Sequence, residues 1–188
     1  MGPDSEAIAF SKQAKDLDPF SPVAALNFCR SYYLARRLDE ASTCFDKLVQ
    51  DNPGFNNGQY TRAFVYLQGG RLSEGIEILK DLYANVKDKR SVAGGLGYAY
   101  ALKGDRESAY KMLAELEHLS NIPAQEFMLI YLGLRDDEKT FYWLDRAATD
   151  HYAPVAYIGV DPMYDPIRKD PRFIAIANRL NVPVTRAN

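Results

Sequence analysis

The chain has 188 residues, of which 47% are hydrophobic, and a formal net charge of −2. This length and apolar content are enough to bury a substantial core. A surface that binds nucleic acid is normally clearly basic, so the charge argues against direct nucleic-acid binding. No apolar run approaches the ~20 residues that cross a bilayer, and residues 1–18 are too polar for a secretory signal.

The first expected element is a single helix over residues 5–19. Ala7, Ser11 and Ala14 recur on it at helical spacing, and Pro19 follows. The pattern fits the second helix of a helix pair, yet too few residues precede it to form the first. A chain that opens on half a pair indicates a piece of a longer protein, and a solitary capping helix is the alternative.

Residues 22–120 repeat a two-helix pattern with a period of 34 residues. In each period an aromatic residue in the first helix precedes, by nine positions, a small residue in the second. Small residues let two helices approach closely, and large apolar ones fill the space between turns. Units of this kind bury their apolar faces only against neighbouring units. The residues concerned are Tyr32, Tyr66 and Tyr100 at the aromatic position and Ala41, Gly75 and Ala109 at the small one.

Residues 121–150 fit a fourth helix pair. Tyr131, Thr140, Leu144 and Ala147 take the repeated positions, but they come 31 residues after the preceding pair instead of 34. We attribute this difference to a shorter turn between the helices.

After residue 150 the composition changes, and three Asp-Pro pairs follow within ten residues. Asp is a good helix N-cap and Pro suits the first helical position, so each pair predicts the start of a helix or a turn. The last pair predicts a helix from Pro171 to about Leu180. That helix would seal the exposed end of the array, as terminal caps do. The three pairs are Asp161-Pro162, Asp165-Pro166 and Asp170-Pro171.

In its period and pattern the chain resembles the tetratricopeptide repeat family, whose second helix is usually followed by a proline such as Pro53. Lys87 and Asn121 replace that proline in the next two units, and no Trp opens a first helix. The resemblance implies an all-α fold, a right-handed α-solenoid of antiparallel helix pairs with about four units and a C-terminal capping helix. The expected array covers residues 1–150, with a partial unit at 5–19, full units at about 22–55, 56–89, 90–120 and 121–150, and a capping segment at 151–188.

The stretch from Asp161 to Phe173 resembles the ending of tetratricopeptide regions at the C-termini of bacterial signalling proteins. Winged-helix transcription regulators and some protein kinases are among these proteins. This second resemblance implies a bacterial origin and an effector domain outside these residues.

The family's binding surface is the concave face lined by the first helices, at positions three or four residues apart. The face so predicted is aromatic and apolar with one cation, and Tyr and Arg are the residues expected at binding hot spots. It begins at Val23, and the predicted partner-binding residues are Leu26, Arg30, Tyr33, Asn57, Tyr60, Phe64, Leu67, Tyr98, Gln125 and Leu129.

Catalytic and metal-binding patterns are weak. His118 and His151 are far apart, and neither has Cys or His at metal-ligand spacing. The run Gly94-Gly95-Leu96-Gly97 lies inside an expected helix, so it indicates close helix packing more than a phosphate-binding loop. We therefore expect no enzyme, no catalytic residue, no metal and no cofactor.

Cys29 and Cys44 lie on the paired helices of one unit. A disulfide or redox switch is one interpretation, and two small buried hydrophobic residues, which free cysteines usually are, is the other. We favour the second, and with it a reducing, cytoplasmic location.

The leading hypothesis is a regulatory protein-interaction module that binds a peptide or helix of a partner through the apolar groove. The groove could instead be covered by the chain's own terminal segment or by a second copy of the chain, or hold a small ligand. A sensor or oligomerisation domain of a bacterial transcription regulator is the alternative function, and an accessory domain of an enzyme is a third.

Overall fold

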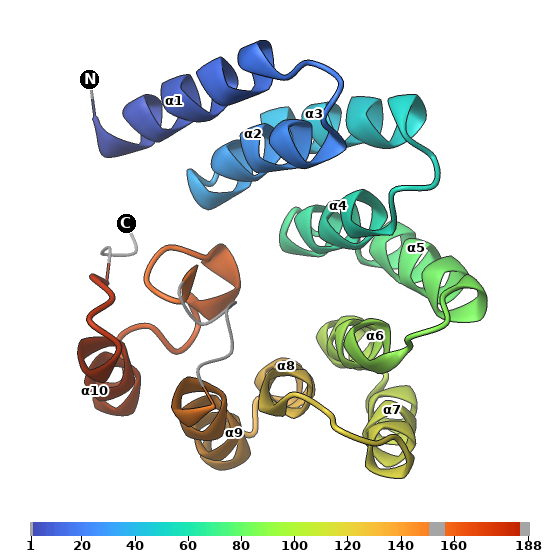
Figure 1. Cartoon of the computed structure of the whole chain (residues 1–188). Coiled ribbons are helices and arrows are strands. Elements are labelled where there is room, and N and C mark those ends of the chain that lie inside the picture. Colours follow the sequence, from blue (N-terminus) through green and yellow to red (C-terminus); the bar gives the residue numbers. More distant parts are fainter. Residues whose placement is uncertain (1, 151–156, 185–188) are drawn as a thin grey trace. The chain divides into compact units, whose positions relative to one another are not determined.

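The computed structural model describes residues 2–150 and 157–184. Within these ranges the chain is all-α, and no strand is present. Figure 1 shows the helices in chain order. They are α1 (Pro3–Leu17), α2 (Pro22–Leu34), α3 (Leu38–Asp51), α4 (Asn56–Gln68), α5 (Leu72–Asn85), α6 (Arg90–Lys103), α7 (Arg106–His118), α8 (Ala124–Leu134), α9 (Asp137–Thr149), the 3-10 helix η2 (Pro162–Tyr164) and α10 (Pro171–Arg179).

The helix starts repeat with the period expected from the sequence. Helices α2, α4, α6 and α8 begin 34 residues apart, and so do α3, α5 and α7. Short connections make consecutive helices neighbours that run in opposite directions. The predicted all-α fold of successive helix pairs is therefore confirmed.

The last pair departs from the period for a reason that differs from our expectation. Helix α9 begins 31 residues after α7, but the turn before it has the same two residues as the turn between α6 and α7. The difference arises in the helix, because α8 has 11 residues and α6 has 14. The attribution to a shorter turn was wrong.

Side-chain caps mark several helix starts. The hydroxyl of Ser21 accepts a hydrogen bond from the Ala24 N–H at 3.2 Å, and Pro22 occupies the first position of α2. Asp105 caps α7 in the same way. Asp161 and Asp170 cap η2 and α10, each followed by Pro. These caps satisfy amide donors that a helix start leaves unpaired, and α10 confirms the helix predicted after Asp170-Pro171.

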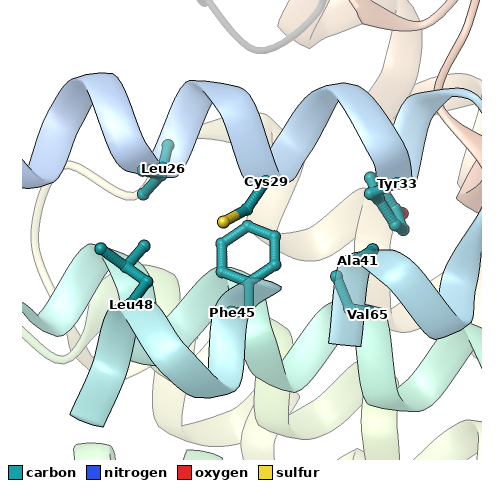
Figure 2. Packing of buried hydrophobic residues seen from close by; sticks show 7 residues of the cluster. All are labelled: Leu26, Cys29, Tyr33, Ala41, Phe45, Leu48 and Val65. Carbon is teal, nitrogen blue, oxygen red and sulfur yellow. The ribbon is translucent and has the colours of Figure 1, made fainter. Parts of the chain in front are cut away.

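The chain divides into two compact units, Met1–Ile78 and Leu79–Asn188, which we describe separately. In unit 1, helix α2 packs against α1 and α3, and α3 packs against α4. Figure 2 shows residues of α2 facing residues of α3, with one residue of α4 beside them. This core consists of Leu26, Cys29 and Tyr33 of α2, Ala41, Phe45 and Leu48 of α3, and Val65 of α4.

Cys29 and Cys44 form a disulfide bond that joins α2 to α3, with their Cα atoms 5.3 Å apart. The expectation of two free thiols was therefore wrong. Cys29 is buried, whereas Cys44 is half-buried on α3. The helix pairing brings the two Cβ atoms together, and spacing in the sequence alone does not reveal that approach.

In unit 2, helix α6 packs against α7 and α8, and α8 also packs against α9. Three glycines allow the close approach of α6 and α8. A methyl group on Gly94 would stand 3.0 Å from the Cα of Glu126, and one on Gly133 would stand 2.8 Å from the Cβ of Ala101. A methyl group on Gly97 would meet Ile130 at 2.5 Å. The expectation that the glycines of α6 serve helix packing is confirmed.

Residues 157–184, the C-terminal segment, belong to unit 2. Helix α10 packs against α9, where Arg172 pairs with Glu138 and Arg179 pairs with Asp145, both at 2.7 Å. The turn before α10 is organised by Arg168, whose side chain is only 2% exposed. Its guanidinium donates hydrogen bonds to the carboxylate of Asp165 and to the backbone carbonyl oxygens of Ile158, Gly159 and Asp161.

Candidate functional site

Unit 1 contains a cavity of about 350 Å³ between α2 and α4. Side chains three and four residues apart share one face of a helix, and each of the two helices turns one such face toward the cavity. Helix α2 contributes Val23, Leu26, Asn27 and Arg30, α4 contributes Asn57, Tyr60 and Thr61, and Phe55 comes from the connection before α4.

Helix α3 supports both walls of this cavity from behind. It packs against α2 and α4, whose direct contact with each other is small. Leu26 belongs to the core shared with α3, and Phe55 packs against the same core. The walls therefore rest on a common buried layer, which holds α2 and α4 apart at the distance that leaves the cavity.

The cavity wall is chemically mixed. Leu26, Val23 and Phe55 supply apolar surface, while Asn27 and Asn57 supply amides and Arg30 a guanidinium. The ring of Tyr60 packs against Phe64 with centroids 4.9 Å apart, which limits where its hydroxyl can lie. A pocket of this size and composition suits one anchoring group with a polar edge.

Four of the predicted site residues line the cavity: Leu26, Arg30, Asn57 and Tyr60. The other three in unit 1 lie in its interior, since Tyr33 is 4%, Phe64 8% and Leu67 3% exposed. Asn27, Phe55 and Thr61 also line the cavity and were absent from the prediction. Asn27 and Thr61 follow Leu26 and Tyr60 directly, so a rule that accepts spacings of both three and four could have included them.

In unit 2 the predicted site residues lie on a face that is covered. Tyr98 on α6 is 3% exposed and Leu129 on α8 is 1% exposed. Gln125 is half-buried, and its Oε1 has no hydrogen-bond partner among the described residues. These three residues therefore do not form an open surface.

The C-terminal segment lies over this face. Tyr164 is 1% exposed, and its hydroxyl lies within electrostatic reach of Tyr98 and Glu126. Burial raises the pKa of the Tyr164 phenol well above its ordinary value of 10, and the acidic groups of Asp161 and Glu126 raise it further. The sequence analysis left open whether a terminal segment covers the groove, and in unit 2 the chain covers this part itself.

The described residues contain no group of three or more His, Cys, Asp or Glu side chains placed to hold a metal ion. No helix in the part of the chain that the structure describes is long and apolar enough to cross a membrane. His118 lies in the last turn of α7, where a cation would meet the negative end of the helix dipole favourably. His151 lies outside the described residues.

No protein-family model matches the chain, and no curated protein matches its sequence.

Proposed function

We propose that the chain is a tetratricopeptide-type interaction module that binds a segment of a partner protein in the cavity of unit 1. The observation that carries this proposal is the cavity itself, at which Leu26, Arg30, Asn57 and Tyr60 meet. They were chosen from the repeat register alone, as positions of the family's binding face. A regulatory role fits such a site, because three anchors worth ~2 kcal/mol each give a dissociation constant in the micromolar range.

The disulfide changes the proposed location. Cysteine pairs persist in oxidising compartments and are rare in the cytoplasm. The Cys29–Cys44 bond therefore favours an oxidising compartment over the cytoplasmic one expected from the sequence. It also weighs against the alternative function, because a transcription regulator works where thiols are kept reduced.

The test is capture of partner proteins by the whole chain and by a Tyr60→Ala variant. Tyr142→Ala is the matched control, because Tyr142 is a 55% exposed tyrosine of α9 in unit 2. Phe64 stays intact, since truncation of a buried phenylalanine would cost about 3–5 kcal/mol and disturb the fold. Circular dichroism must show equal helicity for all three proteins.

A partner that is captured by the chain and by Tyr142→Ala, but lost with Tyr60→Ala, would support the proposal. A partner retained equally by all three proteins would place binding elsewhere and contradict it.

A further inference from the structure

Two repeat periods separate the cavity of unit 1 from the covered face of unit 2. Helices α2 and α6 begin at corresponding positions, and so do α4 and α8. In this register the cavity residue Arg30 corresponds to Tyr98, Tyr60 to Met128, and Thr61 to Leu129. The two surfaces are therefore the same face of the repeat, compared here within one chain.

The exposure of the two faces differs sharply. Tyr98, Met128 and Leu129 are between 0% and 3% exposed. In unit 1, Val23 is 55% exposed and both Arg30 and Tyr60 are half-buried. A face that the chain covers in unit 2 is thus accessible in unit 1.

The covering segment shows what this face of the repeat accommodates. Met163 and Tyr164 are buried, and both lie on the single turn of η2. Asp161 closes the start of that turn by accepting a hydrogen bond from the Met163 N–H at 3.0 Å. Asp165 ends it. The unit 2 face therefore receives an aromatic side chain on a tight turn that carries two acidic residues.

The charges on the two faces favour such a turn more strongly in unit 1. The Tyr164 hydroxyl lies near Tyr98, which is uncharged, and near Glu126, which is acidic. The corresponding residues of unit 1 are Arg30 and Gly58. Unit 1 thus has a guanidinium where unit 2 has a phenol, and it lacks the carboxylate, so an acidic segment meets attraction there instead of repulsion.

We propose that the cavity of unit 1 binds the aromatic side chain of a short acidic turn in a partner protein, of the kind that residues 161–165 present to unit 2. This inference rests on the proposed function and names the chemistry of the partner. The cavity volume of about 350 Å³ lies at the low end of ligand pockets, which suits one anchoring side chain.

The test uses a synthetic peptide with blocked ends and the sequence Asp-Pro-Met-Tyr-Asp-Pro, carrying a fluorescent label. Fluorescence polarisation with the whole chain measures its dissociation constant, which we expect in the micromolar range. Replacing the peptide's Tyr by Ala should weaken binding at least tenfold, because the aromatic ring is the anchor. Replacing both Asp residues by Asn should weaken it severalfold and remove most of its dependence on salt.

Variants of the protein locate the site. Tyr60→Ala and Arg30→Gln should each weaken peptide binding at least tenfold, whereas the control Tyr142→Ala should leave it unchanged. Arg30→Gln should also abolish the preference for the acidic peptide over its Asn form. Circular dichroism checks that the variants remain folded, and Arg30→Lys, which keeps the charge, should restore part of the preference.

Three results would overturn the inference. One is no binding at millimolar peptide, another is equal binding of the Tyr and Ala peptides, and the third is binding that Tyr60→Ala and Arg30→Gln leave unchanged. Concentration-dependent dimers that the peptide dissolves would make the occupant a second copy of this chain, which also contradicts a partner protein. If a partner depends on Tyr60 in the capture experiment but the peptide fails, the proposed function stands and only this inference falls.

Discussion

Cys29 and Cys44 are covalently joined, and the bond ties α2 to α3 one residue before Arg30 reaches the cavity. It closes a short loop of the chain, with a sequence separation of 15 residues between the two cysteines. A disulfide across a loop of this length stabilises a fold by about 3 kcal/mol, mainly by restricting the unfolded chain.

Reduction of this bond should lower the thermal unfolding midpoint by several degrees. Circular dichroism with and without a phosphine reductant measures the shift, and alkylation with mass spectrometry confirms that both thiols are released. A Cys29→Ala, Cys44→Ala variant should unfold near the reduced midpoint and ignore the reductant. Identical midpoints for oxidised and reduced protein would contradict a stabilising disulfide.

Replacement of Gly94 by Ala should destabilise unit 2 by about 1–3 kcal/mol, the usual cost of overpacking. The added methyl group would stand 3.0 Å from the Cα of Glu126, so α6 and α8 must separate. Ala by itself favours a helix over Gly by about 1 kcal/mol, so any net loss reports the clash. Urea unfolding measures it.

Gly54→Ala is the matched control for that experiment, because a methyl group on Gly54 meets no atom within 4 Å. Its effect should stay within about 0.5 kcal/mol. A neutral or stabilising Gly94→Ala would mean that α6 and α8 approach less closely than described.

Replacement of Arg168 by Met should loosen the turn before α10. Four acceptors would lose their donor, and removing one partner of a buried pair costs about 3–5 kcal/mol. Hydrogen exchange of residues 157–170 should rise most in this variant. Arg168→Lys should fall between it and the unaltered chain, because an ammonium lacks the planar fork of donors.

Arg172→Lys provides the comparison for Arg168. Arg172 pairs with Glu138 at the surface, where the two side chains are 42% and 88% exposed. Such pairs contribute at most about 1 kcal/mol, so exchange should hardly change. Equal effects at the two arginines would contradict the role assigned to Arg168.

The pKa of Tyr83 should lie near 12. Burial is the main cause, and the hydrogen bond that its hydroxyl donates to Glu115 at 2.9 Å adds to it. Since this pKa is above the ordinary value of 10, the folded state holds the proton more tightly than the unfolded state. The resulting stability is complete below pH 10 and is lost as the pH rises toward 12.

Absorbance of tyrosinate at 295 nm in the unaltered chain, minus that of Tyr83→Phe, isolates this titration. Glu115→Gln should lower the midpoint, because an amide does not repel the phenolate. A midpoint close to 10 in the unaltered chain would show that neither burial nor Glu115 acts on this tyrosine.

Most of the helical organisation was predictable, because its signals are local. The 34-residue period fixed where the helix pairs lie, and Asp170-Pro171 marked the start of α10. The disulfide was not predictable, since the approach of Cys29 and Cys44 depends on how two helices pack and not on their separation in the chain.

The candidate site was predictable in part for the same reason. Leu26, Arg30, Asn57 and Tyr60 follow from helical spacing within single units. The burial of Tyr98 and Leu129 depends on Tyr164, which lies on a different element far along the chain. No periodic pattern connects those positions, so sequence reasoning assigned them to an open groove.

Tyr164 remains attached to the face that it covers, and this attachment sets a threshold for competing ligands. A segment tethered to its own binding face acts at an effective concentration that is typically millimolar. A free peptide of equal intrinsic affinity would have to reach a similar concentration to displace half of it. The face around Tyr98 therefore rejects weak ligands at cellular concentrations, and an array of similar helix pairs offers fewer places for a partner than it has repeats.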